Sequence, residues 1–178
     1  MCVSFLMVVV KDQFSLMSNK KLEHPFQPLV FKDSKILILG SFPSIDSFEK
    51  SFYYAHPRNQ FWKLLSKLSR YPINNRDQKM WLLKVSKIAL WDMVKNCTRD
   101  NSLDSSLDDI EVNDLAGFLE EHPSIEKIAF TGRLAERLFK MNFDYLEIET
   151  LYLPSPSSAY AKMSFEQKLE KYRELLEF

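Results

Sequence analysis

KILILG, at residues 35–40, decides the fold class of this chain, because it is a continuous apolar run closed by Gly40. Such runs are typical of strands that are buried on both faces of a parallel sheet. Three further runs have the same β-rich character, namely KIALWD (87–92), EKIAFTG (126–132) and LEIETLYL (146–153). Together the four runs predict a sheet of four parallel strands.

Helical patterns alternate with these runs. Apolar residues recur at helical spacing in four segments, which carry Phe61, Leu64, Leu65 and Leu68; Met80 and Leu83; Leu134, Leu138 and Phe139; and Phe165, Leu169, Tyr172 and Leu176. Asn113 is expected to cap a further helix, and Ser164 with Gln167 fits a capping box at the start of the last one. Strands alternating with helices indicate a parallel sheet that is covered on both faces.

The composition is that of one ordinary globular domain. Of the 178 residues, 46% are hydrophobic, which is enough for a core and excludes a disordered chain. The 24 basic and 24 acidic side chains give a formal net charge of zero, which argues against a protein that holds nucleic acid by charge alone. Cys2 and Cys97 are too few for a disulfide framework or a cysteine zinc site, and they suit a reducing, cytoplasmic location.

The N-terminal segment is expected to lie outside the domain. The first ten residues, MCVSFLMVVV, are apolar but far shorter than the ~20 residues that span a bilayer, and they lack a basic start and a clear cleavage pattern. No membrane partner is therefore expected. We interpret residues 1–28 as an extension of a domain at 29–178, and we expect Met17 to be the true initiator.

Charge is distributed unevenly along the chain. Nine basic residues and one acid, Asp77, lie between Lys50 and Lys87, whereas nine acids and no base lie between Asp100 and Glu126. One interpretation is a positive face and a negative face, the first suited to nucleic acid. The alternative is two ordinary solvated helical faces.

Unusual residues follow the predicted strands, at the sheet edge where ligands bind in folds of this class. Gly40 and Gly132, two of only three glycines, end the first and third runs. The segment after Gly40 holds five rings, at Phe42, Phe48, Phe52, Tyr53 and Tyr54. So many rings in a loop favour stacking on nucleobases, and filling the core beneath the loop is the alternative. The last run leads into LPSPSSAYA (153–161), whose serines and amides can hold phosphate oxygens.

Five motifs in this order, GSFPS (40–44), FYYAHPRNQFW (52–62), IALWDMV (88–94), NDLAGFLEEHPSIEKIAFTG (113–132) and LPSPSSA (153–159), resemble the uracil-DNA glycosylase superfamily. They are most similar to its hypoxanthine-DNA glycosylase branch. The resemblance covers about Leu29 to Phe178 and implies a three-layer α/β/α sandwich on a four-stranded parallel sheet. It also implies a monofunctional enzyme, without metal or other cofactor, that flips a deaminated base, hypoxanthine or uracil, out of DNA and hydrolyses its glycosidic bond.

The resemblance implies roles for individual residues. Asn59 resembles the catalytic asparagine of the branch, and its amide can orient water or donate to a base. The residues of the base pocket would be Gly40, Ser41, Phe42, Pro43, Ser44, Phe52, Tyr53 and Tyr54. The residues in contact with DNA would be Arg58, Pro154, Ser155, Pro156, Ser157 and Ser158. The usual second motif reads LPSTSPA, so Pro156 and Ser158 are departures from it.

Two residues are candidates for auxiliary roles. Asp92 ends the second strand, where it could activate water or instead cap a loop. His56 could contact phosphate or serve as a hydrogen-bonded scaffold residue. A hydrolase triad of Ser41, His56 and Asp92 lacks the G-x-S-x-G context, and His24 and His122 are not spaced as metal ligands.

Two other functions compete with the glycosylase interpretation. The changed LPSPSSA loop suggests a damaged-DNA-binding protein of the same fold with little or no turnover. The aromatic pocket alone suggests a hydrolase of free nucleosides. The expected assembly is a monomer bound to DNA that contains a deaminated base.

Overall fold

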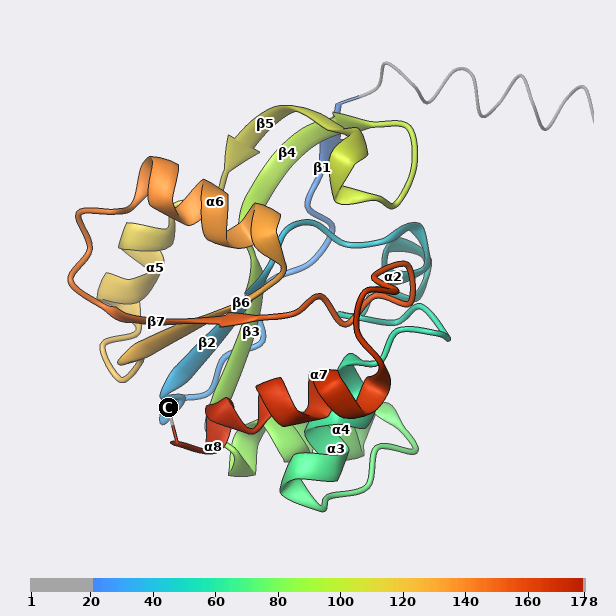
Figure 1. The fold of residues 1–178 in the computed structure, drawn as a ribbon. Coiled ribbons are helices and arrows are strands. Elements are labelled where there is room, and N and C mark those ends of the chain that lie inside the picture. Colours follow the sequence, from blue (N-terminus) through green and yellow to red (C-terminus); the bar gives the residue numbers. More distant parts are fainter. Residues whose placement is uncertain (1–20, 178) are drawn as a thin grey trace, which may run out of the picture.

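The computed structural model describes residues 21–177 and contains a parallel sheet of four strands (Figure 1). The strand order is β3 (Ile88–Asp92), β2 (Ile36–Gly40), β6 (Lys127–Thr131) and β7 (Glu149–Leu153). The predicted sheet is thereby confirmed. The last strand begins three residues after Leu146, because Leu146 and Ile148 donate their N–H groups to nearby carbonyls in a turn.

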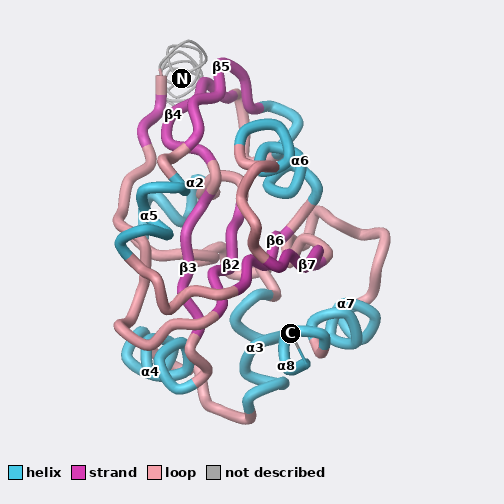
Figure 2. Tube along the Cα trace, turned by 90° about the vertical axis from the view of Figure 1, so that its left-hand side faces the viewer, coloured by secondary structure: helices cyan, strands magenta, loops and turns pink. Residues whose placement is uncertain are grey.

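Helices cover both faces of this sheet and make it the middle layer of an α/β/α sandwich (Figure 1 and Figure 2). One face carries α3 (Phe61–Ser69), α4 (Arg76–Val85), α7 (Phe165–Tyr172) and α8 (Glu174–Glu177), and the other carries α5 (Leu115–Glu121) and α6 (Arg133–Asn142). The alternation of β2 explains the two cores. Ile36 and Ile38 pack toward the first face, whereas Leu37 and Leu39 pack toward the second.

A small antiparallel sheet, which the sequence did not indicate, adjoins the parallel one. It contains β1 (Leu22–Glu23), β4 (Val94–Arg99) and β5 (Leu107–Val112), with the short 3-10 helix η1 (Asp104–Ser106) between the last two. These strands are only partly buried and rich in polar residues, so they lack the continuous apolar run of β2.

Residues 21–28, which the sequence assigns to an extension, pack on the domain. Leu22 and Glu23 pair with β4, and the backbone of Leu29 exchanges two hydrogen bonds with Leu90. The expected start at Met17 lies outside the described residues. Within residues 21–177, no helix combines the length and the apolar character that crossing a bilayer requires.

Most of the helices start where the sequence predicts. The capping box of Ser164 and Gln167 is confirmed at the start of α7. The prediction that Asn113 caps α5 is wrong by one residue, because Asp114 Oδ1 accepts the Gly117 N–H (3.0 Å) while Asn113 Nδ2 donates to the Asp92 carbonyl (2.8 Å). The ring-rich segment also contains a short helix, α2 (Ile45–Lys50), where only a loop was expected.

Candidate active site

The FYYAHPRNQFW segment (52–62) and the LPSPSSA segment (153–159) meet at the edge of the parallel sheet where its strands end. The Gln60 N–H donates to the Pro156 carbonyl (2.9 Å), which joins the turn before α3 to the loop after β7. Beside this bond lies a pocket of about 100 Å³, which we call the inner pocket. Its lining comprises Gly40, Ser41, Phe42, Pro43, Ser44, Ser47, Tyr53, Tyr54, Asn59, Asp92, Ser102, Asp104, Thr131, Ser155, Pro156 and Ser157.

Most of the residues that the sequence singles out are brought together in this lining. The exceptions are Phe52, His56, Arg58, Pro154 and Ser158, which do not line the inner pocket. Ser47, Ser102, Asp104 and Thr131 line it although nothing in the sequence pointed to them.

The expectation that Phe52 belongs to the base pocket is wrong. Its ring is 7% exposed and stacks on Trp62 within the core, with 5.4 Å between ring centroids. Arg76 and Lys79 cover the Phe52 ring with their cationic groups. For this ring, the alternative of filling the core beneath the loop is the correct one.

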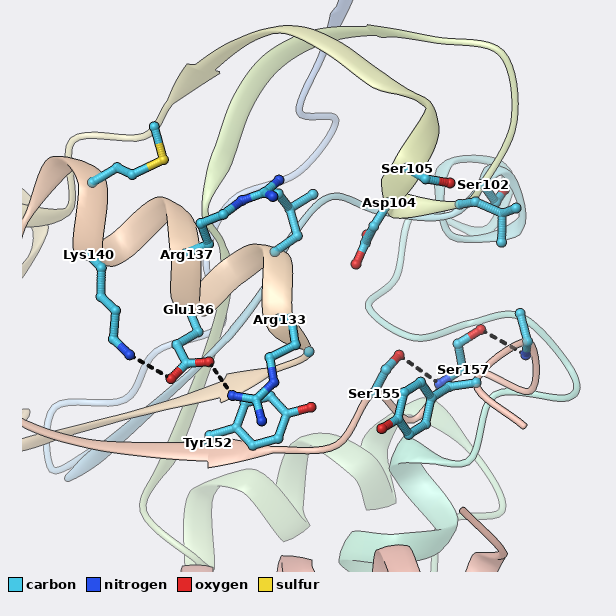
Figure 3. Close-up of a pocket in the computed structure, with 16 residues that line it drawn as sticks. Ser102, Asp104, Ser105, Arg133, Glu136, Arg137, Lys140, Tyr152, Ser155 and Ser157 are labelled. Atoms are coloured by element: carbon cyan, nitrogen blue, oxygen red, sulfur yellow. Dashed lines mark hydrogen bonds and ion pairs between the residues drawn. The ribbon is translucent and has the colours of Figure 1, made fainter. Parts of the chain in front are cut away.

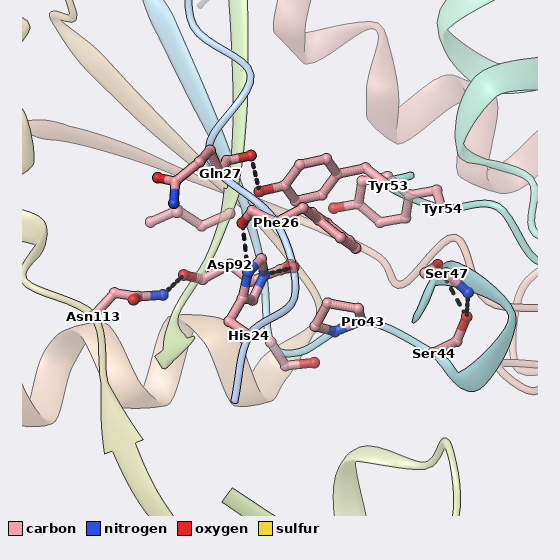
Figure 4. Close-up of polar contacts among 12 residues, drawn as sticks. His24, Phe26, Gln27, Pro43, Ser44, Ser47, Tyr53, Tyr54, Asp92 and Asn113 are labelled. Atoms are coloured by element: carbon pink, nitrogen blue, oxygen red, sulfur yellow. Dashed lines mark hydrogen bonds and ion pairs between the residues drawn. The ribbon is translucent and has the colours of Figure 1, made fainter. Parts of the chain in front are cut away.

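Tyr53 and Tyr54 form one wall of the inner pocket and are held rigidly (Figure 4). The Tyr53 hydroxyl donates to the Gln27 carbonyl (3.2 Å). The Tyr54 ring stacks on the Phe61 ring, with 3.8 Å between ring centroids, and the Tyr54 hydroxyl forms a hydrogen bond with Thr131 Oγ1 (2.9 Å). Burial raises the pKa of both phenols well above the ordinary value, and the charge of Asp92 acts in the same direction. Both hydroxyls therefore stay protonated.

Asn59 lies in a tight turn that fixes its side chain. Its N–H donates to the His56 carbonyl (2.9 Å), and its Oδ1 accepts the Phe61 N–H (2.9 Å). Within residues 21–177, no acceptor bonds the Asn59 Nδ2 group, so this donor is available to a ligand in the pocket.

His56 and Arg58 belong to the same turn but point elsewhere. His56 Nδ1 accepts the Arg58 N–H (3.1 Å), and His56 Nε2 lies 3.8 Å from Asp46 Oδ2. This placement agrees with the scaffold interpretation of His56. Arg58 is exposed, and in the described chain no carboxylate lies within ion-pair distance of its guanidinium.

Asp92 is the buried acid of the inner pocket and has a histidine partner (Figure 4). Its Oδ2 lies 2.8 Å from His24 Nε2, and both side chains are 5% exposed. His24 Nδ1 lies 2.8 Å from the Phe26 carbonyl oxygen. Sequence reasoning missed His24 as a partner, because it lies 68 residues before Asp92 in a segment that was assigned to an extension.

Gly40 makes room for the Asp92 carboxylate. A Cβ atom at Gly40 would lie 2.3 Å from Asp92 Oδ1 and 3.2 Å from the Tyr54 hydroxyl oxygen. Any other residue here would have to displace one of these two groups.

Asp104 brings a second carboxylate from η1 to the inner pocket. Although much of the residue is exposed, its Oδ1 accepts a hydrogen bond from Ser41 Oγ. Withdrawal of the carboxyl group from water raises the pKa of Asp104, and the negative charge of Asp92 adds to this, whereas the Ser41 hydrogen bond and Arg137 oppose it. The sequence did not single out Asp104. It lies in a stretch (100–126) with eight other acids, and nothing in the sequence distinguishes it from them.

A larger cleft of about 830 Å³, which we call the outer groove, adjoins the inner pocket (Figure 3). It lies between α6 and the loops around Asp104 and Ser157, and both of these residues also line the inner pocket. Its basic side chains are Arg133, Arg137 and Lys140. Its volume is typical of a ligand cleft (~300–1,000 Å³), whereas the inner pocket is too small for more than one compact group.

Two of these basic side chains are held in place by neighbours. Glu136 accepts hydrogen bonds from Arg133 (2.8 Å) and Lys140 (2.9 Å), and the Arg133 guanidinium lies 3.6 Å from the centre of the Tyr152 ring.

Nowhere in residues 21–177 are three or more histidine, cysteine or acidic side chains grouped to hold a metal.

Comparison with known proteins identifies the family of the chain. A sequence model described as the uracil DNA glycosylase superfamily matches residues 28–177. The chain belongs to this superfamily. Two proteins named hypoxanthine DNA glycosylase, from Methanosarcina acetivorans and Methanosarcina barkeri, are each 34% identical to it, over 151 and 110 residues. The first alignment covers 84% of this chain and 95% of the relative, and the second covers 61% and 70%.

The fold of this superfamily member is shared with a solved structure. A solution NMR structure from Methanosarcina acetivorans, described as a candidate uracil DNA glycosylase, has a TM-score of 0.75 and 33% sequence identity. The match covers 88% of this chain and 99% of that one. The predicted superfamily and the predicted α/β/α fold are both confirmed.

Proposed function

We propose that the protein is a monofunctional DNA glycosylase that removes hypoxanthine from DNA by hydrolysis of the N-glycosidic bond. The observation that carries the proposal is the position of Asn59 in the inner pocket, where its side-chain Nδ2 group is available to a ligand. The inner pocket adjoins the outer groove, which is lined in part by basic side chains. The names of the two Methanosarcina relatives support hypoxanthine as the base.

The sizes of the two cavities favour a nucleic acid over a free nucleoside. An enzyme that acts on a base in a duplex must rotate it out of the stack, so the base enters a pocket while the strand stays outside. The inner pocket (about 100 Å³) suits the base, and the outer groove (about 830 Å³) suits the flanking sugar and phosphates. A nucleoside hydrolase would have no use for Arg137, the basic side chain of the outer groove that is not paired with Glu136.

The lining also favours hydrolysis by water. Cleavage of the bond places positive charge on the sugar and negative charge on the departing base. Asn59 can donate from Nδ2 to the base or orient a water molecule through the free lone pair of Oδ1. No lysine lines the inner pocket, so the described residues offer no amine there for a Schiff base, and this supports a monofunctional reaction.

The finer parts of the proposal concern substrates and setting. Uracil and mismatched deaminated bases are proposed as further substrates, because flipping is easiest for a base that pairs poorly. Base excision repair is the proposed process, with the protein acting as a monomer in the cytoplasm.

A substrate panel tests the function. Duplexes with a single hypoxanthine, uracil or xanthine are incubated with the protein under single-turnover conditions and then treated with alkali, which cleaves abasic sites. We expect cleavage of the hypoxanthine duplex, and we expect Asn59→Ala to reduce its rate by about 10²–10⁴-fold. The variant should still fold, with a melting temperature a few degrees lower, because it loses the bond from the Phe61 N–H to Asn59 Oδ1.

Each rival function has its own outcome in this panel. Binding without cleavage of any duplex would favour the damaged-DNA-binding protein. Turnover of free deoxyinosine with little salt-sensitive DNA affinity would favour the nucleoside hydrolase. Unchanged cleavage by Asn59→Ala would remove Asn59 from the mechanism.

A further inference from the structure

We propose that Asp104 is a catalytic residue of the hydrolysis, because its carboxylate is placed to face the sugar and to accept the proton that the attacking water loses. This inference rests on the proposed glycosylase function and deepens it. It supplies a group that Asn59 lacks, because a side-chain amide can orient water but does not bind a proton at neutral pH.

The inner pocket and the outer groove meet at a small set of side chains, which we call the junction. Within residues 21–177, the residues that line both cavities are Ser102, Asp104, Ser155 and Ser157. The proposed function places the base in the inner pocket and the flanking sugar and phosphates in the outer groove, so the glycosidic bond crosses the junction. Asp104 is the member of this set that has an ionisable side chain.

The two oxygens of the Asp104 carboxylate face different surroundings. Oδ1 accepts the hydrogen bond of Ser41 Oγ, and Ser41 lines the inner pocket alone. Oδ2 accepts no hydrogen bond from the described part of the chain, and it lies 3.9 Å from the place that a Cβ atom of Gly132 would take. Gly132 lines the outer groove, and Figure 3 shows the carboxylate directed into the space between α6 and the loop of Ser155. Oδ2 is therefore the oxygen that can accept a proton at the junction.

The other acids that line the two cavities are not placed for this step. Asp92 lines the inner pocket but not the outer groove, and its Oδ2 is bonded to His24. Glu136 lines the outer groove but not the inner pocket, and both of its oxygens accept hydrogen bonds from basic side chains. Asp104 is the carboxylate that reaches both cavities.

The sign of the charge on Asp104 suits the reaction and opposes the binding of the strand. A carboxylate repels the phosphates of DNA, so this side chain lowers affinity. As the glycosidic bond breaks, positive charge develops on the sugar, and a carboxylate beside the sugar stabilises it, as in the hydrolysis of other glycosidic bonds. Catalysis therefore explains an acid at the junction, and affinity for DNA does not.

Electrons and protons balance in this step. The bond between C1′ of the sugar and the ring nitrogen breaks, and its electron pair goes to the base. A water oxygen bonds to C1′ and gives one proton to Asp104. The base takes up one proton from solvent and Asp104 returns one to solvent, so the products are the free base and an abasic sugar.

Asp104→Asn tests the proposal in single-turnover reactions with a hypoxanthine duplex at a series of protein concentrations. We expect the rate at saturating protein to fall by about 10²–10⁴-fold, because the amide cannot accept the proton. The protein concentration that gives half of this rate should stay equal or decrease, because a negative charge leaves the DNA-binding surface. A variant that merely disturbed the fold would bind DNA more weakly, so the two quantities separate catalysis from scaffolding.

The pH dependence of the rate gives a second readout. Withdrawal from water raises the pKa of Asp104, and the charge of Asp92 on β3 adds to this. The Ser41 hydrogen bond and the charge of Arg137 on α6 oppose the rise, and Tyr54, which also faces the carboxyl group, stays protonated. Because the ionised form accepts the proton, the wild-type rate at saturating protein should rise with pH through this pKa and then level off. Ser41→Ala should move the rise to higher pH, and Asp104→Asn should abolish it.

Asp108→Asn is the matched control, because Asp108 is an exposed acid of β5 that lines neither cavity. We expect its rate, affinity and pH profile to match those of the wild type. If Asp104→Asn releases hypoxanthine at the wild-type rate, or loses affinity alone, Asp104 has no catalytic role and the proposed function still stands. A wild-type protein that releases no hypoxanthine would overturn the proposed function as well.

Discussion

The inner pocket and the outer groove share several residues but are built in opposite ways. The inner pocket contains buried side chains that have hydrogen-bond partners within the protein, such as Asp92 (4% exposed) and Tyr53 (2% exposed). The outer groove is lined by long basic side chains of α6 on an exposed surface, including Arg133, with its guanidinium over Tyr152. Groups withdrawn from water act strongly on a reacting centre, whereas exposed charges are weakened by salt. The difference supports the proposal that the first region carries the chemistry and the second binds the strand.

The largest expected effect comes from closing the inner pocket with Gly40→Ala. The new methyl group would meet Asp92 Oδ1 and the Tyr54 hydroxyl. The Asp92 carboxylate is held by His24, and the Tyr54 hydroxyl is held by Thr131. We expect at least a 100-fold loss of hypoxanthine release in single-turnover assays and a destabilisation of about 1–3 kcal/mol by urea unfolding.

Gly117→Ala is the control for this substitution. Its Cβ would meet the carboxylate of Asp114, which is an exposed capping side chain that can move aside. Activity should stay at the wild-type level. Equal losses of hypoxanthine release in the two variants would show that the effect does not depend on the inner pocket.

A smaller effect is expected when the outer groove loses a charge through Arg137→Ala. DNA affinity should fall several-fold, and the slope of log K against log salt should decrease by about one, as expected for one lost phosphate contact. Fluorescence anisotropy at several salt concentrations measures both quantities. The rate of base release at saturating protein should change little.

Arg173→Ala provides the comparison for that experiment. Arg173 pairs with Glu170 near the end of the last helices and lines neither cavity. Its loss should leave the salt dependence unchanged. If both arginine variants behave alike, the groove does not hold the strand.

The smallest expected effect is on folding stability and concerns Asp104, which belongs to both regions. Because its pKa is raised in the folded state, the folded protein binds this proton more tightly than the unfolded chain does. The ionised carboxylate therefore disfavours folding at neutral pH. Asp104→Asn should be slightly more stable than the wild type at pH 7, and the difference should vanish below about pH 3, where the carboxyl is protonated in both states. Thermal melts at both pH values measure it, and a variant that is less stable at pH 7 would contradict the sign.

The sequence predicts the parallel sheet well and the polar partners poorly. The β2 run is readable because both of its faces are buried, so every residue from Ile36 to Leu39 is apolar. The β4 and β5 strands are half exposed and polar, and they form through backbone pairing that leaves no apolar run.

The candidate site likewise contains residues that the sequence predicted and residues that it did not. Asn59 and the Pro156 loop carry local motifs, and the bond from Gln60 to Pro156 shows that they meet. His24 is found only in three dimensions, because its partner Asp92 belongs to a distant strand. Phe52 was misassigned since composition places rings in a loop without saying whether they face a ligand or the core.

The two-residue strand β1 has a practical consequence for anyone who shortens this protein. A recombinant form trimmed to residues 28–177, the span that the family match delimits, would keep the parallel sheet, both helical layers and Asn59. It would nevertheless discard the imidazole beside Asp92, together with Phe26. Homology-guided boundaries would thus yield a fragment that keeps Asn59 and loses the hydrogen-bond partner of Asp92.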